Sequence, residues 1–177
     1  MGRSRYKIFE PTHPHFITCT TLHWIPIFTR VETTDIVFQS LKYLQIADNL
    51  KIFAYVILEN HLHLVAQSDD IAKTMSKFKS FSAREILKHL KEKNAQTILE
   101  QLAFYKKAHK SDRELQLWQE GIQPKLIVDE EMMLSRINYI HNNPVKRGYV
   151  DEAKHWRYSS ARDYEGMVGL LEVEKLF

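Results

Sequence analysis

The 177-residue sequence contains a single cysteine, Cys19, and only five glycines and five prolines. One thiol cannot form an internal disulfide or supply a zinc site built on paired cysteines, so we expect a reducing compartment. No stretch approaches the roughly 20 apolar residues that a membrane helix requires. The basic start, residues 1–7, is not followed by the apolar segment of a signal peptide. We therefore expect a cytoplasmic protein without membrane association.

The scarcity of glycine and proline also leaves no linker, and no repeat or low-complexity tract interrupts the chain. Hydrophobic residues make up 44% of the sequence, which is sufficient for a folded core. The net charge is only +3, but lysine and arginine recur over 73–110 and 146–162. Such clusters either solvate the surface or face an anionic partner. We expect one domain over 1–177, with a basic N-terminal arm at about 1–12 and a C-terminal extension at about 145–177.

The residue patterns predict an α+β protein with a mainly antiparallel sheet and helices packed on it. Runs of β-branched and aromatic residues indicate strands, and apolar residues at helical spacing indicate helices. Thr33-Thr34-Asp35 and Ser68-Asp69-Asp70 have side chains that cap helices, and Pro144 is expected to end the last helix near Asn143. Strands are predicted over 15–28, which Pro26 ends or places at an edge, 52–58 and 61–67, and a strand or extended segment interrupted at Gly121 and Pro124 is predicted over 115–128. Helices are predicted over about 35–47, 71–93 and 130–143, and a short helix with a polar loop over 94–110.

Two histidines, His61 and His63, lie two residues apart on the strand predicted over 61–67. Residues at this spacing share a face of a strand, so both imidazoles point one way while Leu62 and Leu64 point into the opposite layer. Two neutral imidazoles form half of a divalent-metal site, which an oxygen ligand and substrate or water must complete. Two polar residues on an open sheet face explain the same pattern without a metal.

A second candidate lies in the helix predicted to end near Asn143. Tyr139 and Asn143 are four residues apart and share a helix face. A phenol can act as a covalent nucleophile, and the Asn143 amide oxygen can reach the same metal. Arg136 lies one turn before Tyr139 and can place positive charge against a phosphate. A packing tyrosine followed by an asparagine helix cap explains this spacing equally well.

The helix predicted over 71–93 has a narrow basic stripe opposite its apolar side, at about 100° per residue. The stripe is either a solvated face or a ridge that follows the phosphates of a nucleic acid. Its members are Lys73, Lys77, Arg84, Lys88 and Lys91.

Taken together, these segments resemble a known family over about residues 15–164. Residues 52–65, IFAYVILENHLHLV, resemble the strand-turn-strand of the single-tyrosine HUH transposases. Residues 118–150 resemble the C-terminal signature of the REP-associated tyrosine transposases, with Tyr-Ile-x-x-Asn-Pro-Val-Lys at its centre. Residues 155–164, HWRYSSARDY, resemble the segment that follows it. The sequence differs at Glu59, where the family often has proline.

The resemblance implies a ferredoxin-like HUH endonuclease core and a metal-dependent endonuclease and strand transferase for single-stranded, hairpin-containing DNA. It implies that Tyr139 is the nucleophile and that His61, His63 and Asn143 bind Mg²⁺ or Mn²⁺. Attack on a phosphodiester then leaves a 5′-phosphotyrosine and a free 3′-hydroxyl. It also implies a nucleoid-associated protein, either a monomer or a homodimer. A non-cleaving DNA- or RNA-binding module on the same fold is the alternative.

Further residues are candidates for contacts with DNA. A basic N-terminal arm can reach a groove, cations that follow the tyrosine helix can hold phosphates, and tryptophans can stack on unpaired bases or pack in the core. His13-Pro14-His15 repeats the histidine spacing as a weaker metal pair, because Pro14 lacks an N–H. The candidates for DNA contacts are Arg3, Arg5, Lys73, Lys77, Arg84, Arg136, Lys146, Arg147 and Arg157, with Trp118 and Trp156 for stacking.

Overall fold

The computed structural model describes residues 10–112, 114–122 and 124–175. One sheet of four strands has the order β2-β3-β1-β4, with every neighbouring pair antiparallel, which confirms the predicted α+β fold. The strands are β1 (His15–Thr20), β2 (Lys51–Ile57), β3 (His61–Gln67) and β4 (Lys125–Leu126). The α-helices are α1 (Val31–Ala47), α2 (Ile71–Glu92), α3 (Gln96–Phe104), α4 (Glu130–Lys146) and α5 (Ala161–Tyr164). Short 3₁₀ turns are η1 (Leu22–Trp24), η2 (Ile27–Thr29) and η3 (Ala153–His155).

The consecutive strands β2 and β3 form a tight hairpin. The Leu58 N–H donates to the His61 carbonyl at 2.8 Å, so only Glu59 and Asn60 make the turn. On its other side β3 pairs with β1, and this register sets Thr18 opposite His63. A strand that is hydrogen-bonded on both sides is fixed along its length, and its alternating side chains must enter two different layers.

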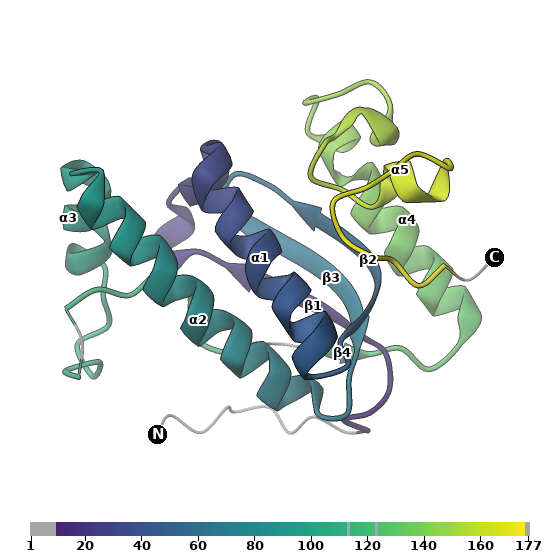
Figure 1. Ribbon diagram of the computed structural model, residues 1–177, viewed down its shortest axis with the longest axis horizontal. Helices are drawn as coiled ribbons and strands as arrows, with labels where there is room; N and C mark the ends of the chain where they lie inside the picture. The colour runs from purple at the N-terminus through teal and green to yellow at the C-terminus, as the bar shows by residue number, and fades with distance from the viewer. Residues whose placement is uncertain (1–9, 113, 123, 176–177) are drawn as a thin grey trace.

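The sheet separates two hydrophobic cores. On one face, α1 and α2 lie side by side (Figure 1), and the core beneath them contains Leu62 and Leu64 of β3 together with Phe78 of α2. On the opposite face, α4 packs on β2 and β3 through Ile137 and Ile140. His61 and His63 therefore face α4, while Leu62 and Leu64 face the other layer, as the alternation of β3 requires.

The C-terminal extension covers the outer edge of β2. The Ile57 N–H donates to the Tyr158 carbonyl at 2.8 Å, and the Ser160 N–H donates to the Tyr55 carbonyl at 3.0 Å. The Ser160 hydroxyl also lies 2.8 Å from His141 Nε2 on α4, so this segment joins the sheet to the helix. Within the described residues, no helix has the length and hydropathy needed to cross a bilayer.

One predicted strand is wrong in extent, and a second segment is interrupted as predicted. The first, predicted over 15–28, ends at Thr20, because His23 and Trp24 adopt left-handed φ angles of 51° and 59° that break an extended chain. The segment over 115–128, predicted as a strand or extended segment interrupted at Gly121 and Pro124, pairs at an isolated bridge between Thr21 and Trp118 and again at the two residues of β4. Gly121, with φ 78°, turns the chain away from the sheet before it returns.

Two helix boundaries also differ from the prediction. Helix α1 begins at Val31, and its Thr33 and Thr34 hydroxyls bond back to the carbonyls of Ile27 and Phe28 instead of capping the helix. Helix α4 continues past Pro144 to Lys146, because a proline one turn from the end removes a single hydrogen bond. The short helix and polar loop predicted over 94–110 are confirmed, and the helix corresponds to α3.

The buried His141 imidazole makes the fold sensitive to acid. Desolvation lowers its pKa to about 4, whereas an unfolded chain takes up the proton near pH 6.5. A depressed folded-state pKa means that stability is intact above pH 6.5 and falls as the pH drops toward 4. From pH 7.5 to 5 we expect this group to cost roughly 2 kcal/mol of unfolding free energy.

Urea unfolding at both pH values tests this expectation. His141→Gln should lose less stability between them than the unchanged chain, whereas His155→Gln, at an exposed histidine, should behave like the unchanged chain. Equal losses in all three proteins would contradict a neutral buried His141.

Candidate active site

The histidine pair lies at the start of β3, next to the hairpin turn, on the face of the sheet that α4 covers. The His61 and His63 ring centroids are 4.9 Å apart, and the two side chains are 3% and 6% exposed. Strand alternation brings both rings to one face, and burial restricts their orientation. The two imidazoles thus form a compact, half-enclosed pair of nitrogen donors.

Asn60 fixes the tautomer of His61. The Asn60 Nδ2 amide donates to the Trp24 carbonyl at 3.2 Å, so its Oδ1 atom must accept, and His61 Nδ1–H donates to it at 2.7 Å. A neutral imidazole with a proton on Nδ1 presents the Nε2 lone pair. Orientation of a ring through its other nitrogen is typical of metal-binding histidines.

His63 has a matching partner on the neighbouring strand. Thr18 Oγ1 lies 2.8 Å from His63 Nδ1, and these residues are directly opposite in the β1–β3 register. When the hydroxyl accepts from Nδ1–H, Nε2 is again the nitrogen that carries the lone pair. Both rings of the pair can therefore present the same atom to an ion.

Tyr139 approaches this pair from α4. Its ring centroid is 5.4 Å from that of His63 in an edge-to-face arrangement, and Phe16 of β1 contacts both rings at 5.4 and 5.8 Å. Tyr139 remains 39% exposed, so solvent and a substrate can reach its hydroxyl. Arg136, one turn earlier, lies over the Phe16 ring at 5.2 Å.

Asn143 lies one turn after Tyr139 and is connected to the hairpin turn through Arg147. Arg147 Nε donates to Asn143 Oδ1 at 3.2 Å, and Arg147 Nη1 pairs with Glu59 Oε1 at 2.8 Å. Within the described residues, Glu59 Oε2 is buried without a hydrogen-bond partner. A charged bridge thus ties the C-terminal end of α4 to the turn between β2 and β3.

Burial keeps both imidazoles of the pair neutral. Desolvation, with smaller contributions from Arg147 and an opposing one from Glu59, lowers the pKa of His61 to about 4. Desolvation, with His61 and Arg147, lowers the pKa of His63 to about 3. At neutral pH each ring is therefore unprotonated on one nitrogen, which is the state that binds a metal.

The donor set fits a divalent cation only if non-protein ligands complete it. Among the residues that the structure describes, no three His, Cys, Asp or Glu side chains are grouped closely enough to hold an ion. His61 and His63 present two neutral nitrogens, and Asn143, whose Oδ1 accepts from Arg147 Nε, carries an amide oxygen of the kind that suits Mg²⁺ or Mn²⁺. A phosphate oxygen and water would fill the remaining positions.

The structure brings some predicted DNA-contact residues to this site and separates others from it. Arg136 and Arg147 lie beside it, and Lys146 and Arg157 are exposed. The basic residues of α2 lie across the sheet from Tyr139, under a different core. Of the α2 residues predicted to contact DNA, Lys77 pairs with Asp48 at 2.6 Å and Arg84 with Glu85 at 2.9 Å. These two and Lys73 therefore belong to another surface, and Arg3 and Arg5 lie outside the described residues.

The remaining candidates have structural roles. Trp118 is 5% exposed and donates to Ser82 Oγ at 3.1 Å, so it packs in the core and is not available to bases. Trp156 is partly buried and donates to the Ile57 carbonyl at 2.9 Å. His13 is exposed, whereas His15 is buried with Nδ1 bonded to the His13 carbonyl at 2.7 Å, so the two rings lie in different environments.

Four residues around the site were not predicted as site residues. They either orient an imidazole or contact a ring, and all of them come from β1, η1 or the hairpin turn. For Thr18 and Phe16 the relevant signal is their alternation with the buried Ile17, which becomes informative only once the β1–β3 register is known. The four are Phe16, Thr18, Trp24 and Asn60.

Comparison with known proteins gives three findings. The family model described as IS200-like transposase matches residues 10–113. A relative from Haemophilus influenzae, named a REP-associated tyrosine transposase, is 32% identical over 111 residues, which are 60% of this chain and 56% of that protein. A solved structure of a REP-associated tyrosine transposase bound to a REP hairpin has a TM-score of 0.66 at 16% identity, covering 98% of this chain and 93% of that one. The last finding shows a shared fold.

The Arg147 guanidinium should hold down the pKa values of both imidazoles. We expect Arg147→Met to raise the pKa of His61 and of His63, because a nearby cation disfavours a second positive charge. Histidine Cε1–H signals followed by NMR over a pH titration measure this change. Lys146→Met, at the exposed neighbouring position, is the matched control. Unchanged histidine titration in Arg147→Met would refute the electrostatic coupling.

Proposed function

This chain belongs to the IS200-like transposase family, and on that premise we propose that it cuts and rejoins single-stranded DNA through Tyr139. The observation that carries the proposal is the contact of the Tyr139 ring with His63, 5.4 Å between centroids, on the face of the sheet that α4 covers. An exposed phenol beside two neutral imidazoles is the combination that a metal-assisted phosphodiester transfer needs.

The proposed step is a direct displacement at phosphorus. The Tyr139 oxygen forms a bond to phosphorus as its proton passes to solvent, which reaches the partly exposed side chain. The bond from phosphorus to the 3′-oxygen breaks, and that oxygen leaves as a hydroxyl after taking a proton. The product is a 5′-phosphotyrosine, and attack by a 3′-hydroxyl reverses the step. One phosphodiester bond replaces another, so rejoining the strand requires no nucleoside triphosphate.

His61, His63 and Asn143 are the residues that would hold a divalent cation, through two Nε2 atoms and one amide oxygen. Bound there, Mg²⁺ or Mn²⁺ would neutralise the non-bridging oxygens of the phosphate. Asn60 and Thr18 orient the two rings through their Nδ1 atoms. Phe16 packs against His63 and Tyr139 and keeps the phenol at a fixed distance from the imidazoles.

We propose hairpin-containing single-stranded DNA as the partner. The support is the shared fold with a REP-associated tyrosine transposase whose solved structure holds a REP hairpin. On this chain, Arg136, Lys146 and Arg157 offer cations near α4 that can bind phosphates. Cytoplasmic, nucleoid-associated action follows from a DNA substrate. The match with the Haemophilus influenzae relative covers 56% of that protein's length.

Tyr139→Phe tests the nucleophile. The protein is incubated with a single-stranded hairpin oligonucleotide labelled at its 3′ end, and Mn²⁺ is added. We expect a labelled protein–DNA adduct on a denaturing gel for the unchanged chain and none for Tyr139→Phe, because only the phenol oxygen can form the ester. Tyr149→Phe, at another exposed tyrosine, should keep the adduct. An adduct that persists in Tyr139→Phe would refute this assignment.

Removal of the cation separates cleavage from binding. EDTA, or His63→Ala, should abolish the adduct and leave hairpin binding measurable by fluorescence anisotropy. Loss of Nε2 donors is expected to lower adduct formation at least a hundredfold, because both imidazoles share one ion. Tight hairpin binding by the unchanged chain, with no adduct in Mg²⁺ or Mn²⁺, would instead identify a non-cleaving binding module.

A further inference from the structure

The segment after β1 meets the end of α3 through a contact between the His23 and Tyr105 rings, and each of these residues has an aromatic neighbour in the sequence, Trp24 and Phe104. His23 and Tyr105 are stacked with centroids 3.7 Å apart and planes at 14°, and Phe104 contacts Tyr105 at 5.0 Å. Trp24, Phe104 and Tyr105 are 54%, 81% and 39% exposed. We name these residues the aromatic platform. Aromatic rings that gather on a surface mark a site of interaction.

The part of the platform that follows β1, His23 and Trp24, is held in place by its surroundings. His23 and Trp24 both have left-handed φ angles, which bulky residues adopt only when the structure around them enforces it. The buried Thr21 hydroxyl donates to the Ile25 carbonyl at 2.7 Å and contacts the Asn60 carbonyl at 2.9 Å, so the turn is fastened on both sides. A prearranged surface loses little conformational entropy when it binds a ligand.

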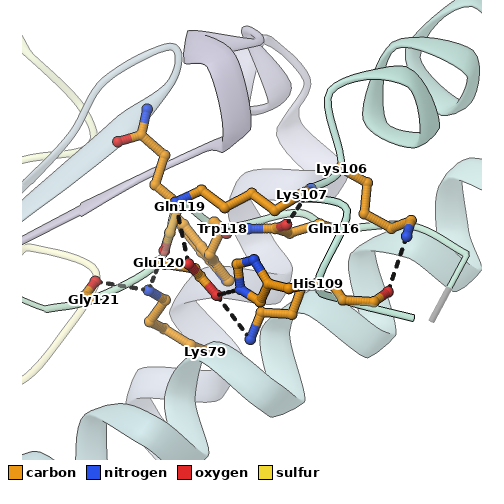
Figure 2. A network of polar contacts seen from close by, with 10 residues as sticks. Lys79, Lys106, Lys107, His109, Gln116, Trp118, Gln119, Glu120 and Gly121 are labelled. Carbon is orange, nitrogen blue, oxygen red and sulfur yellow. Dashed lines mark hydrogen bonds and ion pairs between the residues drawn. The ribbon is translucent and has the colours of Figure 1, made fainter. Parts of the chain in front are cut away.

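Lysines surround the segment that follows the platform (Figure 2). Lys107, His109 and Lys110 all reach the Glu120 carboxylate, at 3.1, 2.7 and 2.9 Å, and they lower its pKa to about 2. In this network Glu120 pairs with two lysines, while Lys106 donates to the Lys110 carbonyl and Lys79 donates to the carbonyls of Gln119 and Gly121. The network fixes the loop after α3 against α2 and leaves excess positive charge beside the aromatic rings.

The platform also adjoins the candidate active site. The Trp24 ring meets the His61 ring edge-on at 5.6 Å, and Asn60 bonds both to the Trp24 carbonyl and to His61 Nδ1. Stacked rings flanked by lysines fit a single strand of nucleic acid, because every base has a face that stacks and the cations track the backbone. Protein-binding surfaces are instead depleted in lysine.

We propose that the aromatic platform stacks the unpaired bases of single-stranded DNA next to the phosphate that Tyr139 attacks. The inference rests on the proposed function for the identity of the nucleic acid. Tyr105 with His23 provides one stacking surface, Trp24 directs the strand toward the histidine pair, and Lys106 and Lys107 lie along its phosphates.

Equilibrium binding in EDTA tests the platform without cleavage. The probes are a fluorescent DNA hairpin with a dT8 tail, the same hairpin without the tail, and the hairpin with an abasic tail of equal length. Trp24→Ala, Tyr105→Ala and Phe104→Ala should each weaken binding of the dT8-tailed hairpin about tenfold. They should not change binding of the hairpin without a tail, and the abasic tail should erase the differences.

Tyr43→Ala is the matched control, since Tyr43 is 63% exposed on α1 away from this surface, and it should bind as the unchanged chain does. Phe104 is so exposed that its variant retains the fold even if Trp24→Ala does not. Equal affinities of the platform variants and the unchanged chain for the dT8 tail would overturn the platform, as would equal losses for the hairpin without a tail. Absence of a Tyr139 adduct in Mn²⁺ would count against the proposed function alone, because the tail measurement requires no cleavage.

Discussion

The alternation of side chains along β3 is the constraint on which the candidate site depends. Neighbouring strands hold β3 on both sides, so it cannot slide or rotate without breaking two ladders of hydrogen bonds. Leu62 and Leu64 enter the core beneath α1 and α2, and this burial forces His61 and His63 to the opposite face. Desolvation then keeps both rings neutral, Asn60 leaves Nε2 as the lone pair of His61, and Thr18 leaves the same atom of His63 when its hydroxyl accepts from Nδ1–H.

The second layer positions the phenol by the same kind of packing. Ile137 and Ile140 of α4 are buried against the sheet, which sets the rotation of the helix about its axis. Tyr139 lies beside that apolar stripe, half in solvent, and Phe16 fills the space between it and His63. Hydrophobic contacts of α4 therefore determine how close Tyr139 lies to the histidine pair. Arg147 joins the end of α4 to the hairpin turn.

Local patterns were sufficient for the elements whose signal is contained in a short segment. The predicted β3 and α2 agree with the structure to within about one residue, because an alternating strand after a tight turn and an Asp70-capped amphipathic helix are both determined locally. Over 115–128, Gly121 and Pro124 were sufficient to predict an interrupted segment, but only contact with β1 decides which of its residues pair.

The surroundings of the site could not be predicted for a related reason. The roles of His61, His63, Tyr139 and Asn143 came from resemblance to a family, since their spacing alone also fitted a polar sheet face and a capped helix. The partners that orient the rings come from positions distant along the chain, such as Thr18, which is 45 residues from His63. Such pairs depend on strand register, which composition and periodicity do not specify.

The cover on β2 has a consequence for any shortened version of this protein. Besides the bonds at Tyr55 and Ile57, the Glu174 N–H donates to the Ile52 carbonyl at 2.9 Å, so backbone from two parts of the extension occupies the edge of an apolar strand. A truncation before Tyr158 would uncover those donors and acceptors, and an uncovered apolar edge is a template for aggregation. The extension thus protects the sheet against self-association. Its removal would lower the solubility of the protein before it affected the chemistry of the site.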